Sequence, residues 1–218
     1  MKFGTSGLRG LSEDLKGRAS ALYATAGADV VAFGRSDTFI PVDTEAVSEE
    51  TIAILKDAAR THGLDAIVSA DGDGDRPLVT DETGTPLRGD LIGLIAANFL
   101  GADVVVTPVT SNSGIEASGA FSVTRTRVGS PFVISGMQEA LASGKSGVVG
   151  FEANGGVLLG SDCLLNGKTL AALPTRDSLL PILAVLGTMA STKRPLSRLR
   201  ELWDLPFCAS ERLENFPL

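Results

Sequence analysis

The stretch Asp65-Ala66-Ile67-Val68-Ser69-Ala70-Asp71-Gly72-Asp73-Gly74-Asp75-Arg76 decides the fold. Its first half is apolar and strand-like, and its second half alternates three carboxylates with glycine, so an acidic loop begins where a buried strand ends. Glycine lets the backbone curl until the side chains converge, and hard cations such as Mg²⁺ require oxygen ligands. Three close carboxylates without a cation repel one another. We therefore expect Asp71, Asp73 and Asp75 to bind a divalent metal ion.

Two other interpretations of this loop are open. A solvated acidic turn would need no ion. In a calcium-binding EF-hand, the three aspartates and Glu82 would hold the first, third, fifth and twelfth positions. The sixth position of such a loop needs glycine, but here it is Arg76, and Pro77 follows. The flanks also predict a strand and a hairpin rather than two helices, so the sequence favours Mg²⁺.

The rest of the chain alternates helices with apolar strands. Ser48 can cap a helix that ends at His62-Gly63, and Leu78-Val79-Thr80 predicts a strand before a turn at 81–84. Further elements are expected as helices at 91–100, 132–142 and 178–189, and as strands at 102–107 and 147–151. This alternation predicts an α/β fold of two packed units with mixed, largely parallel sheets.

A five-residue repeat suggests that the two units are similarly built. Gly27-Ala28-Asp29-Val30-Val31 recurs as Gly101-Ala102-Asp103-Val104-Val105. Each copy is expected to lead into a strand. Ligands gather at the carboxyl ends of strands in such sheets, which is where both the acidic loop and Glu152 lie.

The N-terminal segment Phe3-Gly4-Thr5-Ser6-Gly7-Leu8-Arg9-Gly10 is rich in glycine. Glycine permits close approach of the backbone, and Thr5, Ser6 and Arg9 suit a phosphate or carboxylate. No Gly-Lys-Ser/Thr follows, so this is not a Walker P-loop. A flexible leader is the alternative.

A third glycine-rich segment is Gly150-Phe151-Glu152-Ala153-Asn154-Gly155-Gly156. It places an acid and an amide on a turn after a strand, where both can form hydrogen bonds with sugar hydroxyls. An ordinary turn is the alternative, because Asn-Gly is a standard turn dipeptide.

Composition argues against several classes of protein. The 218 residues are 44% hydrophobic with a net charge of −7 and no basic block, which disfavours a nucleic-acid partner. No apolar run is long enough to span a membrane and the start is no signal peptide, so we expect a cytoplasmic protein without a membrane partner. Cys163 and Cys208 form no metal-binding pair. His62 is the only histidine, which disfavours Ser-His-Asp and Cys-His chemistry.

In their order, the three glycine-rich segments resemble the α-D-phosphohexomutase family, particularly bacterial phosphomannomutase/phosphoglucomutase enzymes. Residues 1–10 are similar to its Thr-Ser-Gly-Leu-Arg-Gly signature, and residues 71–76 match its Mg²⁺ loop residue for residue. Residues 150–156 are similar to its sugar-discriminating loop, usually Gly-Glu-x-Ser-Gly-His. Asn154 stands where serine is usual, and Gly156 where histidine is usual. Residues 125–129 are similar to a stretch that precedes a phosphate-contacting residue in the family's third domain.

The resemblance implies that the protein interconverts the 1-phosphate and 6-phosphate of a hexose, either mannose or glucose, through a phosphoserine and Mg²⁺. It implies that the metal ligands are Asp71, Asp73 and Asp75. Catalytic roles in neutralising phosphate oxygens fall to Arg9 and Arg76, and the phosphate-binding residues would be Thr5, Ser6 and Arg9. Sugar recognition would fall to Glu152, Asn154 and Gly155.

Two parts of the family's pattern are missing. No serine is followed by histidine, so the phosphoserine loop Thr-Ala-Ser-His-Asn-Pro is absent, and no Arg-x-Ser-Gly loop of a fourth domain follows. We expect four segments: a first-domain remnant, a metal-loop second domain, a sugar-loop third domain and the lead-in to a fourth domain, at 1–25, 26–90, 91–200 and 201–218. The chain is either truncated or internally deleted, or the sequence as written omits segments. Taken literally, it is expected not to turn over sugar phosphates.

Two alternative functions belong to other classes. A non-catalytic module could bind metal and sugar phosphate as a regulator or partner subunit, with the acidic and sugar loops kept and the nucleophile lost. A metal-dependent phosphatase with an aspartate nucleophile would need an Asp-x-Asp at a strand end near the N-terminus, and the context of the acidic loop argues against it.

Overall fold

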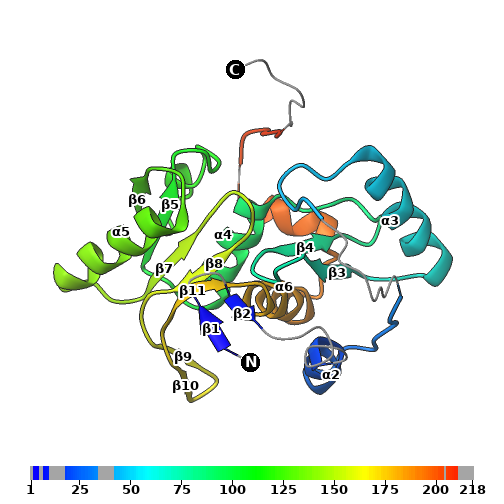
Figure 1. Ribbon diagram of the computed structural model, residues 1–218, viewed down its shortest axis with the longest axis horizontal. Helices are drawn as coiled ribbons and strands as arrows, with labels where there is room; N and C mark the ends of the chain where they lie inside the picture. Colours follow the sequence, from blue (N-terminus) through cyan, green and yellow to red (C-terminus); the bar gives the residue numbers. More distant parts are fainter. Residues whose placement is uncertain (1, 5–6, 10–17, 34–41, 204, 211–218) are drawn as a thin grey trace.

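A computed structural model describes residues 2–4, 7–9, 18–33, 42–203 and 205–210, with side chains from residue 21 onward. Within these ranges, none of the helices has the length and apolar character needed to cross a membrane. The chain forms two packed α/β units, with a five-stranded sheet in one and a strand pair in the other (Figure 1).

The larger unit contains a mixed five-stranded sheet in the order β11-β8-β7-β5-β6. The central strand β5 (Val104–Pro108) is parallel to both β6 (Ser122–Thr126) and β7 (Val148–Phe151). β8 (Val157–Leu159) is antiparallel to β7, and β11 (Leu173–Asp177) is antiparallel to β8. The expected α/β class with a mixed sheet is confirmed, and parallel pairing is concentrated in β6, β5 and β7.

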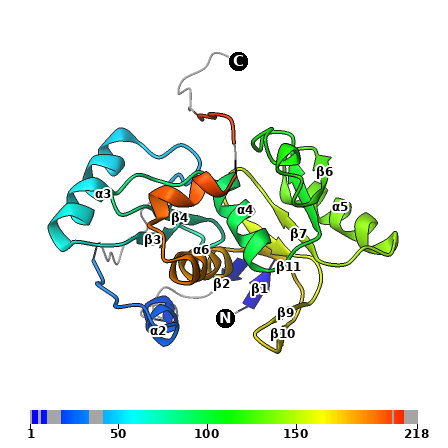
Figure 2. The same cartoon turned by 180° about the vertical axis from the view of Figure 1, so that it is seen from behind.

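Helices cover both faces of this sheet (Figures 1 and 2). Successive side chains of β5 point to opposite faces of the sheet. On one face, Val105 packs in one core cluster with α4 (Gly89–Phe99) and α6 (Leu179–Thr192). Val104 and Val106 pack in a second cluster with α5 (Ser130–Ala142). The three helices expected in this half are therefore present, with ends shifted by up to three residues.

The smaller unit pairs β3 (Ile67–Ala70) with β4 (Pro77–Thr80) in an antiparallel hairpin closed by the acidic loop. The helix α3 (Glu49–His62) covers it, and its core consists of Leu55, Ala59, Ile67 and Leu78. Val79 points away from α3 and belongs to the main core. The two units thus share apolar packing.

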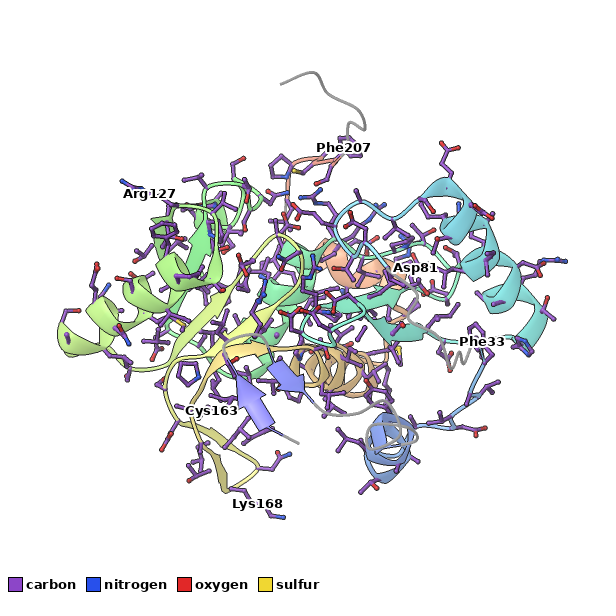
Figure 3. The ribbon with its side chains drawn as sticks, viewed as in Figure 1. Phe33, Asp81, Arg127, Cys163, Lys168 and Phe207 are labelled. Carbon is purple, nitrogen blue, oxygen red and sulfur yellow. The ribbon has the colours of Figure 1, made fainter. Side chains whose placement is uncertain are left out.

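The remaining described elements are short, and Tyr23, Leu196 and Leu199 among them pack in the main core. They are β1 (Lys2–Gly4), β2 (Gly7–Arg9), α2 (Arg18–Thr25), the 3₁₀ helices at Glu116–Ser118 and Leu196–Leu202, β9 (Cys163–Leu165) and β10 (Lys168–Leu170). β1 and β2 form a hairpin whose second strand contacts β11. β9 and β10 form a hairpin that projects from the sheet, with Cys163 at its base and Lys168 toward its tip (Figure 3).

The expectation of a strand after each copy of the repeat is wrong for the first copy. Both copies follow a helix through a glycine with positive φ, +93° at Gly27 and +67° at Gly101. Only the second copy continues into a strand, because β6 and β7 flank β5 on both sides. Within the described residues, no strand pairs with 28–33, and Val31 remains 49% exposed. An apolar extended segment becomes a strand only where a partner offers hydrogen bonds.

Candidate metal and sugar-phosphate site

The acidic loop is held closed by its first residue, Asp71. The Oδ1 atom of Asp71 accepts hydrogen bonds from the backbone N–H groups of Asp75 at 3.1 Å and Arg76 at 3.2 Å. Its Oδ2 atom accepts from Nε of Arg76 at 2.5 Å. Gly74 takes the left-handed conformation, with φ +74°, that the tight loop requires. The loop is therefore fixed by its own sequence.

The three aspartates converge as the sequence predicts. One carboxylate oxygen from each of Asp71, Asp73 and Asp75 lies within 4.8 Å of the other two. Asp75 is only 1% exposed, and its carboxylate oxygens form ion pairs with Arg76 and Arg176 but no well-aligned hydrogen bond with the described residues. Burial raises the pKa of Asp75 to about 6, and the charges of Asp71 and Asp73 add to the rise while Arg176 and Arg76 oppose it. Three converging carboxylates, two of them buried, fit a hard divalent cation.

Arg176 connects the acidic loop to the loop after β7. Its Nη2 atom lies 2.6 Å from Oδ2 of Asp75, and its Nη1 atom lies 3.5 Å from Oε2 of Glu152. Arg176 stands in β11, about 100 residues from Asp75 in the chain. The site therefore contains residues of both units.

The loop after β7, residues 152–156, is a tight turn. The N–H of Glu152 donates to the carbonyl of Gly156 at 3.1 Å, and the N–H of Gly155 donates to the carbonyl of Glu152 at 3.0 Å. The side-chain oxygen of Asn154 accepts from the N–H of Gly156 at 3.1 Å. Glu152 is buried, and burial raises its pKa, while Arg176 acts in the opposite direction.

The loop after β7 packs closely against the start of α4 and against Pro77, which follows the acidic loop. A Cβ atom on Gly89, at the start of α4, would lie 2.2 Å from the backbone N of Gly155 and 2.3 Å from the carbonyl oxygen of Ala153. A Cβ atom on Gly155, whose φ is +89°, would lie 3.1 Å from Cγ of Pro77, the residue that follows the acidic loop. A side chain at Gly89 would push α4 away from residues 153–155, and a side chain at Gly155 would push this loop away from Pro77.

Hydrogen bonds between elements complete the arrangement. The hydroxyl of Ser178, at the start of α6, donates to the carbonyl of Gly74 at 2.8 Å. The hydroxyl of Thr44 donates to the carbonyl of Asn154 at 3.2 Å. Both loops are thus anchored from outside their own hairpins.

Of the residues singled out in the sequence, the structure brings Glu152 and Arg76 to the three aspartates. It describes the N-terminal ones only in part. Arg76 lies over the acidic loop, where Asp71 raises its pKa against the effect of burial. Thr5 and Ser6 fall outside the described residues, as does the side chain of Arg9, the last residue of β2. The residues that converge are Asp71, Asp73, Asp75 and Glu152, and the side chain of Asn154 bonds within its own turn, to the N–H of Gly156.

Arg176 was not predicted from the sequence. β11 is antiparallel to β8, which is antiparallel to β7, so β11 and β7 point the same way. Their carboxyl ends therefore lie at one edge of the sheet. Recognising 173–177 as a strand would have placed Arg176 at this edge. Pro174 and two charged residues interrupt the apolar pattern that is typical of a buried strand, so this strand was not predicted.

Arg125, in the stretch similar to the family's third domain, organises the loop after β5. Its guanidinium donates to the carbonyls of Pro108, Ser111 and Asn112 at 2.7–3.0 Å and pairs with Glu116 at 2.6 Å. These contacts fix the loop from within.

Comparisons with known proteins agree on one family. The family model described as phosphoglucomutase/phosphomannomutase, alpha/beta/alpha domain III, matches residues 88–205. A phosphomannomutase from Sinorhizobium fredii is 53% identical over 97% of this chain and 46% of its own length. A phosphomannomutase from Salmonella muenchen is 46% identical over 89% of this chain and 40% of its own length.

A solved structure extends the likeness to the fold. A phosphoglucomutase/phosphomannomutase family protein from Burkholderia thailandensis superposes with a TM-score of 0.63 at 17% identity, over 84% of this chain and 39% of that one. The fold of this chain is thus shared with part of that protein. The chain belongs to the phosphoglucomutase/phosphomannomutase family, and it spans less than half the length of these relatives.

Proposed function

We propose that this chain carries the metal-binding and sugar-binding parts of a phosphohexomutase active site. In this proposal Asp71, Asp73 and Asp75 bind Mg²⁺, and a hexose phosphate, of mannose or glucose, binds between the acidic loop and residues 152–156. The observation that carries the proposal is the pairing of Arg176 with both Asp75 and Glu152. It supports a single site, because two independent loops would not share one guanidinium.

The donor set supports Mg²⁺ in particular. Carboxylate oxygens are its preferred protein ligands, and when bound the ion supplies positive charge that stabilises a phosphoryl group in transfer. Arg76 would neutralise phosphate oxygens from its position over the acidic loop, and Arg9 would do so from the N-terminal segment. Glu152, Asn154 and Gly155 would orient the sugar.

Turnover is a separate matter from binding. A mutase of this kind passes the phosphoryl group through an enzyme nucleophile, and the sequence has no serine followed by histidine. We propose that the 218-residue polypeptide binds Mg²⁺ and hexose phosphates without interconverting them. The four-segment division at residues 25, 90 and 200 belongs to the same proposal, and a non-catalytic binding module is its alternative.

Calorimetry tests the metal assignment directly. Asp73→Asn removes one anionic ligand of three, so Mg²⁺ affinity should fall at least about tenfold. Asp57→Asn makes the same change at an exposed position of α3 that pairs with Arg60, and it should leave Mg²⁺ binding unchanged. Equal Mg²⁺ affinity for wild-type and Asp73→Asn protein would refute the assignment.

A phosphorus NMR assay tests turnover. Glucose 1-phosphate and mannose 1-phosphate incubated with the purified 218-residue protein and Mg²⁺ should show no 6-phosphate signal. Appearance of a 6-phosphate at a rate proportional to protein concentration would show that the missing serine loop is dispensable.

A further inference from the structure

Arg176 lies in space that exists because residue 156 has no side chain. A Cβ atom on Gly156 would lie 2.9 Å from Cδ and 3.2 Å from Cγ of Arg176. The aliphatic part of the Arg176 side chain therefore passes directly over the backbone of residues 152–156, here called the sugar loop, and its guanidinium reaches the acidic loop. Gly156 and Arg176 fit each other as a pair.

The charges around Arg176 make its position conditional on a cation. Four carboxylates, from Asp71, Asp73, Asp75 and Glu152, face two guanidiniums, from Arg76 and Arg176, which leaves a net charge of −2. A divalent cation cancels that charge. Because the cation and the Nη2 atom of Arg176 both require Asp75, they compete for the same carboxylate.

We propose that Arg176 couples the acidic loop to the sugar loop. It serves as the counter-ion of Asp75 until a divalent cation takes that carboxylate, and its guanidinium then binds the anionic hexose phosphate beside Glu152. This inference rests on the proposed function for the identity of the ligand, and it adds a specificity-determining residue with a defined order of events. Guanidinium groups bind phosphate with charge-assisted, two-pronged hydrogen bonds.

The coupling predicts opposite effects on the two ligands. In Arg176→Met the competitor for Asp75 is gone, so Mg²⁺ should bind on the order of tenfold more tightly. Glucose 1-phosphate and mannose 1-phosphate should bind at least about tenfold more weakly, because a charge-assisted hydrogen bond is lost. A merely structural arginine would give a different pattern, since its removal would loosen the site and weaken both ligands together.

Gly156→Ala tests position without changing charge. The added methyl group must displace Arg176, and the backbone at residue 156 has no positive φ to oppose alanine. We expect the same two opposite effects, smaller than in Arg176→Met. Arg176→Lys keeps the charge near Asp75 and should return Mg²⁺ affinity toward the wild-type value. Arg60→Met, at an exposed arginine of α3, is the matched control and should change neither affinity.

Isothermal titration of Mg²⁺ and of each sugar phosphate, with thermal melts of every variant, decides the proposal. Affinities of Arg176→Met and Gly156→Ala that stay within about twofold of wild type, or that both fall for both ligands, would overturn the coupling. If Arg176→Met fails to fold, Gly156→Ala and Arg176→Lys give the same comparison. Wild-type protein that binds neither Mg²⁺ nor sugar phosphate would instead refute the proposed function, and the coupling with it.

Discussion

At the scale of single residues, the acidic loop shows which parts of a site a local sequence determines. Asp71 closes the loop through hydrogen bonds to residues four and five positions ahead, so its geometry needs no distant partner. The three aspartates accordingly converge as predicted. Arg176 could not be identified in the same way, because its contacts with Asp75 and Glu152 form only once β11 and β7 lie in one sheet, pointing the same way with β8 between them.

Asp75 gives the site a pH dependence. Its pKa in the folded protein, about 6, lies above the ordinary value of 3.8 because the carboxylate is buried. A raised pKa means that this group contributes stability to the metal-free protein fully below about pH 4 and loses it as pH rises through 6. A metal ion needs the ionised form and must displace the proton at lower pH.

We therefore expect Mg²⁺ to raise the melting temperature at pH 7.5 and to have progressively less effect below pH 6. One displaced proton weakens Mg²⁺ binding by about tenfold per pH unit there. Thermal melts with and without Mg²⁺ between pH 5 and pH 8 measure this. An increase in melting temperature that is equal at pH 5 and pH 7.5 would contradict the role given to Asp75.

At the scale of elements, capping and turn residues made several predictions accurate. The hydroxyl of Ser48 accepts from the N–H of Thr51 at 3.2 Å, and Gly63 ends α3 with φ +60°, as the sequence indicates. The turn after β4 is equally local, because Oδ1 of Asp81 accepts from the N–H groups of Thr83 and Thr85 at 2.9 and 3.0 Å. Such elements are fixed by neighbours in sequence.

The short strands were not predicted, for two different reasons. β8 has three residues and β11 contains Pro174, so both lack a periodic pattern and become strands only by pairing with each other and with β7. The hairpin of β9 and β10 did carry a signal, since Asn166 and Gly167 have φ values of 50° and 75° in its turn. Asn-Gly is the standard dipeptide for such a turn.

The start of α4 is the element most sensitive to a small change. Gly89→Ala would place a methyl group within 2.3 Å of backbone atoms of the sugar loop, which cannot move aside as a side chain would. We expect a loss of about 2 kcal/mol in the free energy of unfolding, together with weaker binding of sugar phosphates. Chemical denaturation measures the first effect and calorimetry the second.

Gly119→Ala is the matched control for that change. Gly119, unlike Gly89, has a positive φ of +64°, and a Cβ atom there would meet nothing within 4 Å. Its cost should be limited to backbone strain of about 1 kcal/mol, with sugar-phosphate binding intact. If Gly89→Ala proves no more destabilising than Gly119→Ala, the start of α4 and residues 152–156 are not held together by backbone contact at Gly89.

At the scale of the whole molecule, the site depends on the packing of the two units against each other. Val79 of β4 is fully buried in the main core cluster, together with Ile92 of α4, Ile182 of α6 and Trp203. The acidic loop is further tied to α6 through Ser178. Because apolar packing continues from one unit to the other, we expect the described part of the chain to unfold in one cooperative transition.

Val79→Ala tests this cooperativity. Removing two buried methyl groups from β4 should lower the free energy of unfolding by about 2 kcal/mol, and both units should be destabilised together. Trp203 is the only tryptophan and lies in the shared core, so its fluorescence reports on the larger unit, while far-ultraviolet circular dichroism reports on all helices. The two signals should shift to the same lower denaturant midpoint.

A fluorescence midpoint that stays at the wild-type value while the circular dichroism transition splits would mean that β3, β4 and α3 unfold independently. In that case the acidic loop could lose its metal ligands without disturbing the sugar loop, because the pairing of Arg176 with Asp75 would be too weak to hold the units together.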